Sequence, residues 1–300
     1  MKRKVTGRSV AIRLFAILGL TGLLFAIYLL AVRPSALRWG ATAEEVARSM
    51  PEDDLVPSPS FCATRGITIQ GRPEDIWPWL VQMGYDRAGF YGYDLIENVG
   101  SKTGIHSAES ILPALQHPKT GDVLPISAVA SLGFDLIQPG KYLVWRGNTT
   151  PSDGSFTWAL YPVDANQTRL ISRIRLRYHW TDQRALLDLF TELADHVAVP
   201  RILLGIKGRV EGRPPQSFAA EAIEIAVWQL AMLEFAAAAV FVFRWRRWGR
   251  AWFLGLAAGL LLLFALYAHA PMWIGAMLCC GIFGVMLQSL RKGSGYSPEA

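Results

Sequence analysis

The sequence predicts an α+β domain with a long C-terminal helix, flanked on both sides by helices that span a membrane. Three features of the chain support this prediction. Long apolar stretches lie in its first and last parts, short β-branched runs separated by turn residues lie between them, and a long amphipathic segment follows the last run. With 52% hydrophobic and 18% charged residues, the chain is more apolar than a typical soluble domain.

The first apolar stretch, residues 10–32, contains one charged residue, Arg13, near its start. At about 1.5 Å per residue it is long enough to cross a hydrocarbon layer of about 30 Å. A cleavable signal peptide would have a shorter apolar stretch, of about 7–15 residues, followed by a small-x-small cleavage site. Here Val32-Arg33-Pro34 follows the stretch, so we expect an uncleaved anchor.

Three further apolar stretches lie at about 223–243, 251–268 and 271–290, with a tight turn at His269–Pro271. Basic residues border the spans in three groups: Lys2, Arg3, Lys4, Arg8 and Arg13; Arg244, Arg246, Arg247 and Arg250; Arg291 and Lys292. With four spans, all three groups lie on one side of the membrane, as the positive-inside rule requires. We therefore expect both termini in the cytoplasm and the middle domain outside it. The expected organisation is 1–33 (basic tip and first span), 34–218 (soluble domain) and 219–300 (three spans).

The net charge of +6 does not indicate a nucleic-acid-binding protein, because segment 33–220 has 19 Lys and Arg against 20 Asp and Glu. The basic excess lies at the ends of the apolar stretches. The three cysteines and five histidines show no disulfide framework and no metal-ligand spacing. We expect no metal and no cofactor.

Within the middle domain, alternation and β-branching predict strands at Thr64–Gln70, Asp122–Ile126, Phe134–Gln138, Tyr142–Arg146, Phe156–Pro162 and Arg169–Tyr178. Helices are predicted at about Ala43–Ser49, Glu74–Met83, Tyr91–Asn98 and 182–210. Thr42 and Glu45 have the spacing of a capping box for the first of these helices. The last helix has an apolar face of Leu186, Leu189, Phe190, Leu193 and Val197, and Pro200 should interrupt or kink it.

Several segments resemble the START-like helix-grip superfamily, also called SRPBCC or polyketide cyclase/dehydrase-like, over roughly 36–213. They are Trp39-Gly40-Ala41-Thr42, TRGITIQ, PEDIWPWLVQMGYDRAGFYGYDLIEN, Ile111-Leu112-Pro113, Gly121-Asp122, FTWAL, TRLISRIRLR and Leu204-Gly205-Ile206-Lys207. The resemblance is to a bacterial, membrane-attached subgroup, which places the chain in a bacterial cytoplasmic membrane. It implies a curved antiparallel sheet around the long C-terminal helix, with a cavity for a lipid-like ligand. The superfamily has no shared catalytic residues, so the resemblance assigns none.

The candidate ligand-binding residues are those that could line such a cavity: Trp77, Trp79, Gln82, Tyr91, Tyr93, Asp94, Glu97, Trp158 and Arg173. The aromatic residues could instead form ordinary core. Arg87 and Asp94 could form a simple ion pair, and Arg173 belongs to a basic row (Arg169, Arg173, Arg175 and Arg177) that could be a solvated sheet face.

Three functions remain open from the sequence. The first is a membrane-anchored module that binds or transfers a hydrophobic small molecule, with membrane lipids as its other partners. The second is an enzyme acting on a hydrophobic substrate, for which Asp94, Glu97 and His106 would be the titratable groups. The third is a sensory or protein-interaction module, whose protein partner the sequence does not identify. Glu234, near the middle of a span, should face other helices or a functional site.

Overall fold

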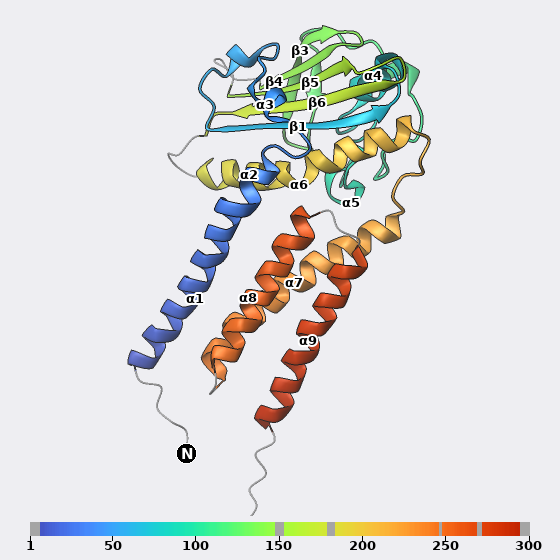
Figure 1. The fold of residues 1–300 in the computed structure, drawn as a ribbon. Coiled ribbons are helices and arrows are strands. Elements are labelled where there is room, and N and C mark those ends of the chain that lie inside the picture. The colour runs from blue at the N-terminus through green and yellow to red at the C-terminus, as the bar shows by residue number, and fades with distance from the viewer. Residues whose placement is uncertain (1–6, 148–152, 179–183, 246–247, 269–271, 295–300) are drawn as a thin grey trace, which may run out of the picture. The chain divides into compact units, whose positions relative to one another are not determined.

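The computed structural model describes residues 7–147, 153–178, 184–245, 248–268 and 272–294 (Figure 1). The basic residues 2–4 and 246–247 and the turn expected at 269–271 lie outside these ranges. The chain divides into two compact units. One comprises Ser35–Glu221, and the other comprises Met1–Pro34 together with Ala222–Ala300.

The first unit contains a six-stranded antiparallel sheet, so the predicted α+β class is confirmed. The strands are β1 (Phe61–Gln70), β2 (Val123–Pro125), β3 (Ser131–Gln138), β4 (Tyr142–Gly147), β5 (Gly154–Pro162) and β6 (Gln167–Leu176), in the order β1-β6-β5-β4-β3-β2. All six predicted strands are present. The first strand pairs with the last, with Ala63 opposite Ile174. The long helix α6 (Arg184–Val210) follows β6 and packs on β1, which is the helix-grip arrangement.

The shorter helices of this unit are α3 (Ala43–Ala47), α4 (Pro73–Gln82) and α5 (Asp94–Glu97), with 3-10 turns η2 (Asp53–Leu55) and η3 (Pro113–Leu115). The capping box is confirmed, because Thr42 accepts a hydrogen bond from the backbone of Glu45 and Glu45 accepts one from Thr42. The helix predicted from Tyr91 begins only at Asp94. Tyr91 has φ +67°, a left-handed conformation that a right-handed helix does not accommodate.

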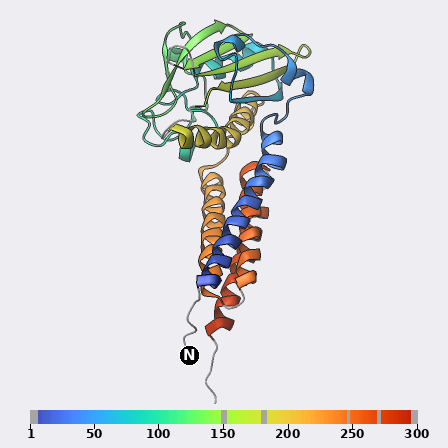
Figure 2. The same cartoon turned by 90° about the vertical axis from the view of Figure 1, so that its left-hand side faces the viewer.

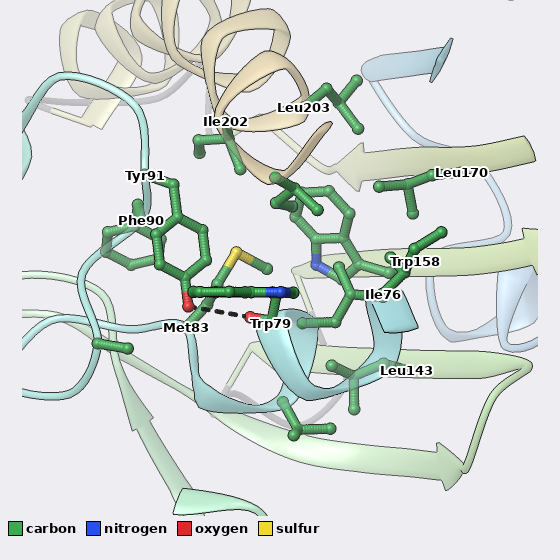
Figure 3. Close-up of a cluster of buried hydrophobic side chains, with 14 of the residues drawn as sticks. Ile76, Trp79, Met83, Phe90, Tyr91, Leu143, Trp158, Leu170, Ile202 and Leu203 are labelled. Carbon is green, nitrogen blue, oxygen red and sulfur yellow. Dashed lines mark hydrogen bonds between the residues drawn. The ribbon is translucent and has the colours of Figure 1, made fainter. Parts of the chain in front are cut away.

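The main core lies between the sheet, α4 and the second half of α6. Figure 3 shows Trp79 and Tyr91 beside Trp158, with Ile202 and Leu203 of α6 above them. Val199 and Ile206 complete the inward face of this half of the helix. These side chains occupy much of the space between the sheet and the second half of α6.

Helix α6 continues through Pro200 rather than ending there, and its axis bends along its length (Figures 1 and 2). The predicted apolar residues do share a face, but in the first half of the helix that face is exposed: Leu186 is 78% exposed and Phe190 is 66% exposed. The buried face of this half carries Glu192, Asp195 and His196 instead.

The second unit is helical. It contains α1 (Gly7–Ile27), a π-helical turn η1 (Tyr28–Val32), α8 (Trp248–Tyr267) and α9 (Met272–Ser294). It also contains the start of α2 (Arg33–Ala36) and most of α7 (Phe218–Arg244), since the boundaries of the units fall after Pro34 and after Glu221. Within the described ranges, three helices are long and apolar enough to cross a membrane: Gly7–Ala36, Phe218–Arg244 and Trp248–Tyr267. In α9 the apolar stretch among described residues is shorter, Trp273–Ser289. Glu234 is buried, as expected for a side chain that faces other helices.

Candidate functional site

A pocket of about 140 Å³ lies beside the second half of α6. Its walls come from the segment before α5, from one face of α6, and from the chain that follows α6. The lining residues are Tyr91, Gly92, Asp94, Arg201, Leu204, Gly205, Gly208, Arg209, Arg213, Pro214, Pro215, Gln216 and Glu221. Arg201, Gly205 and Arg209 recur every four residues and Gly208 follows Gly205 by three, which places all four on one side of the helix.

The wall opposite α6 depends on an unusual backbone conformation at Tyr91. Its N–H donates to Oγ of Ser107 at 3.0 Å, and its hydroxyl donates to the carbonyl oxygen of Trp79 at 3.1 Å (Figure 3). These bonds stabilise a residue whose left-handed φ costs free energy. The Tyr91 carbonyl then approaches α6 so closely that a Cβ at Gly205 would lie 2.0 Å from its oxygen.

Two arginines of α6 lie against aromatic rings of this wall. The guanidinium carbon of Arg209 is 4.4 Å from the ring centroid of Tyr91, and that of Arg201 is 5.1 Å from the ring of Tyr93. Arg209 also donates to the carbonyl oxygen of Ala108 at 2.9 Å. Burial lowers the pKa of Arg209, but guanidinium groups remain charged in proteins. The pocket therefore has fixed positive charge on its α6 side.

Carboxylates form the facing part of the pocket. Asp94 accepts hydrogen bonds from Ser107 N at 2.9 Å and Asn98 Nδ2 at 3.1 Å. Glu221 accepts one from Leu95 N at 2.6 Å.

Glu97 lies directly behind this lining. A Cβ at Gly92 would be 2.5 Å from one of its carboxylate oxygens, so the absence of a side chain at Gly92 makes room for the acid. Burial raises the pKa of Glu97 to about 8, and the charges of Asp94 and Glu221 act in the same direction. At neutral pH this carboxyl group is therefore mostly protonated.

The structure divides the predicted site residues into three groups. Tyr91 and Asp94 line the pocket, and Tyr93 and Glu97 support its wall. Trp79, Gln82 and Trp158 are buried in the core, and Trp77 is partly buried against it. Arg173 lies on the opposite face of the sheet. His106, the third titratable candidate, has a side chain that is 69% exposed.

Gln82 and Arg173 have structural partners. Gln82 Oε1 accepts from Leu112 N at 2.9 Å, and its Nε2 donates to Ser110 O at 3.2 Å, so the side chain holds the segment after Ser110. Arg173 donates to Asp53 Oδ2 at 2.8 Å and to backbone carbonyl oxygens of the 45–48 segment. The basic row is thus not a solvated face, since Arg173 is only 3% exposed and holds the connector before β1.

Sequence reasoning missed two lining residues of α6, Arg201 and Arg209, and two that follow α6 in the chain, Arg213 and Glu221. The spacing of Arg201, Gly205 and Arg209 at four-residue intervals was a usable signal, because small residues between cations on one helix face allow close approach of another segment. It also missed a buried polar cluster of Arg65, Asp195, His196, Glu192 and Tyr178 beneath the first half of α6.

Among the described residues, no group of three or more metal-ligand side chains is close enough to hold an ion.

No protein family model and no curated protein matches the chain. It is similar to solved structures that include protein MLL2253 from Mesorhizobium loti, at 17% identity over 51% of this chain and 98% of that one, with a TM-score of 0.32. The polyketide-cyclase-like protein Cgl2372 from Corynebacterium glutamicum is 12% identical over 50% of this chain and 91% of its own, with a TM-score of 0.33. CalU16 from Micromonospora echinospora is 10% identical over 67% and 88%, with a TM-score of 0.32. The helix-grip assignment rests on the strand order and α6 described above.

Proposed function

We propose that this chain is a membrane-anchored binding protein for an amphiphilic, lipid-like small molecule, whose polar end occupies the pocket beside α6. The observation that carries the proposal is the pocket itself. It combines the cations Arg201 and Arg209 with aromatic rings, and it belongs to a unit whose chain continues on both sides into helices long and apolar enough to cross a membrane.

The size of the pocket limits what it can hold. Pockets that enclose whole drug-sized ligands usually measure about 300–1,000 Å³. A volume of about 140 Å³ suits a polar head group rather than a complete lipid. The apolar part of the ligand would remain outside, because the space between the sheet and the second half of α6 is occupied by core side chains.

The charges of the pocket favour an anionic or zwitterionic head group. Arg201 and Arg209 lie in the same lining as two carboxylates, Asp94 and Glu221, whereas the third arginine, Arg213, is paired with Glu211. Glu97 adds little negative charge at neutral pH because its pKa is raised to about 8. The guanidinium groups present several N–H donors, which suit phosphate and carboxylate oxygens.

The test is native mass spectrometry with lipid extraction on the full chain purified in mild detergent. The wild-type protein should retain a defined amphiphile, and Arg201→Gln should lose it. The matched control is Arg146→Gln. It removes an exposed cation that is paired with Asp135 and lies near the C-terminal end of β4. Equal retention by both variants, or an empty wild-type protein, would contradict the proposal.

A second candidate function is acid–base catalysis on the same bound molecule, and Glu97 is the observation that favours it. A carboxyl group that is still protonated near pH 7 can donate a proton, and such groups are concentrated in active sites. Incubation of the extracted amphiphile with the protein tests this function. Conversion by the wild type that Glu97→Gln abolishes, with binding retained, would support an enzyme, and an unchanged ligand mass with both proteins would exclude this reaction for that ligand.

A further inference from the structure

The first half of α6 has its apolar residues on the side away from the sheet. Five large side chains are exposed there: Leu186, Leu187, Leu189, Phe190 and Leu193. At 100° per residue they lie within one continuous face of the helix. Among the described side chains of this half, the buried ones are Glu192, Asp195 and His196, which are polar and lie on the opposite face.

The buried polar face fixes this orientation. Nη2 of Arg65 in β1 lies 2.6 Å from Asp195 Oδ2 and 2.9 Å from Nδ1 of His196. The hydroxyl of Tyr178 donates a hydrogen bond to Glu192. A rotation of α6 that buried the leucines would separate these partners and leave the charge of Arg65 unpaired within the sheet, which is costly. The exposed leucines are therefore a consequence of the fold, and not of a loosely placed helix.

A continuous face of leucine and phenylalanine in contact with water usually marks an interaction surface. We propose that the first half of α6 lies in the interfacial layer of the membrane that the chain itself crosses, with its leucine and phenylalanine side chains among the upper acyl chains. This inference rests on the membrane anchoring in the proposed function.

Two features favour a lipid surface over a protein partner. The unit that carries α6 is joined to an apolar helix on each side, since α2 ends at Ala36 and α7 begins at Phe218, which keeps it near a bilayer in any arrangement of the two units. The exposed face is also made of leucine and phenylalanine without a charged residue among its five members, whereas the other face is polar, as in helices that lie in membrane interfaces.

The test uses the full chain, with Cys62, Cys279 and Cys280 replaced, reconstituted into phosphatidylcholine–phosphatidylglycerol vesicles. A single cysteine carrying an environment-sensitive fluorophore is placed at Phe190, which is exposed, so the substitution removes no core contact. Label at Phe15, exposed in the first span, is the reference for membrane insertion, and label at Val129, 96% exposed in the β2–β3 turn, is the matched control. Leu186→Cys provides a second labelled position on the same face.

Lipids with nitroxide on the acyl chain should quench the label at Phe190 and at Leu186 to an extent comparable with Phe15, and should leave Val129 bright. Quenching at Phe15 with none at Phe190 would overturn the inference and leave the membrane anchoring intact. Quenching at neither position would overturn both. A Phe190 label protected from lipid quencher and from aqueous iodide alike would show that protein covers this face, which also contradicts the proposal.

Discussion

Nη2 of Arg65, a fully buried side chain of β1, donates a hydrogen bond to Nδ1 of His196 on α6 at 2.9 Å. Because arginine can only donate, Nδ1 must accept, and the ring proton of a neutral imidazole lies on Nε2, facing Glu192 Oε1 at 3.5 Å. Nε of Arg65 donates to Ala36 O at 2.8 Å. One guanidinium thus joins the segment before β1, the sheet and the long helix.

Removing that guanidinium should destabilise the domain strongly. Arg65→Met leaves Asp195 buried without its ion-pair partner, and breaking a buried pair from one side costs about 3–5 kcal/mol. We expect a clear fall in Tm, measured by intrinsic fluorescence in detergent. Arg72→Met, at an exposed arginine, should leave Tm unchanged, and the double variant Arg65→Met, Asp195→Leu should recover part of the loss.

The two glycines that α6 contributes to the pocket lining, Gly205 and Gly208, offer a matched pair on one helix. A Cβ at Gly205 would lie 2.0 Å from Tyr91 O, whereas at Gly208 its nearest neighbour would be Arg213 Cβ at 4.0 Å. Gly205→Ala should therefore destabilise the protein by about 1–3 kcal/mol through overpacking. Gly208→Ala should stabilise α6 by about 0.5–1 kcal/mol, because alanine loses less backbone entropy. Equal Tm values would show that α6 and the Tyr91 segment are not in contact.

The sequence predicted the strands and the alternation of β6 because these depend on local patterns. Leu170 and Ile174 are buried and Arg173 lies on the other face, as the period of two requires. It did not predict which side of α6 faces the sheet. Arg65, Asp195 and His196 lie far apart in the chain, and only their mutual contacts make a polar inward face favourable. The pocket was missed for the same reason, since Tyr91 and Gly205 meet only through tertiary structure.

Glu97 should make the stability of the domain depend on pH. Its pKa is about 8 in the folded chain against an ordinary value of 4.5, so the folded state holds a proton that the unfolded state has released between these values. The free energy of unfolding then falls as pH rises through this window, by up to about 1.4 kcal/mol per pH unit, and levels off above it. Glu97→Gln, measured by denaturation from pH 5 to 9, should flatten the profile. A variant profile parallel to that of the wild type would rule out this titration.

Arg173 should be needed to hold the connector before β1 (residues 43–57) in place and not to bind the ligand. Its guanidinium holds Asp53 and the carbonyl oxygens of residues 45, 46 and 48 on the outer face of the sheet. Arg173→Ala should increase amide hydrogen exchange over residues 43–57 while the amphiphile retained by the protein stays the same. Arg173→Lys should restore the charge but not the multiple hydrogen bonds, so its exchange should be intermediate. Loss of the ligand in both variants would show that Arg173 takes part in ligand binding.

The number of spans can be tested through α9. Its described apolar stretch, Trp273–Ser289, reaches about 26 Å at 1.5 Å per residue, slightly less than the hydrocarbon layer of about 30 Å, whereas the whole helix, Met272–Ser294, is long enough. The basic pair at 291–292 favours a cytoplasmic end. We expect green fluorescent protein fused after Ala300 to fluoresce, and alkaline phosphatase inserted between Gly147 and Gly154 to be active. If green fluorescent protein fused after Ala300 did not fluoresce, and alkaline phosphatase fused at the same place were active, α9 would not cross the membrane and the chain would have three spans.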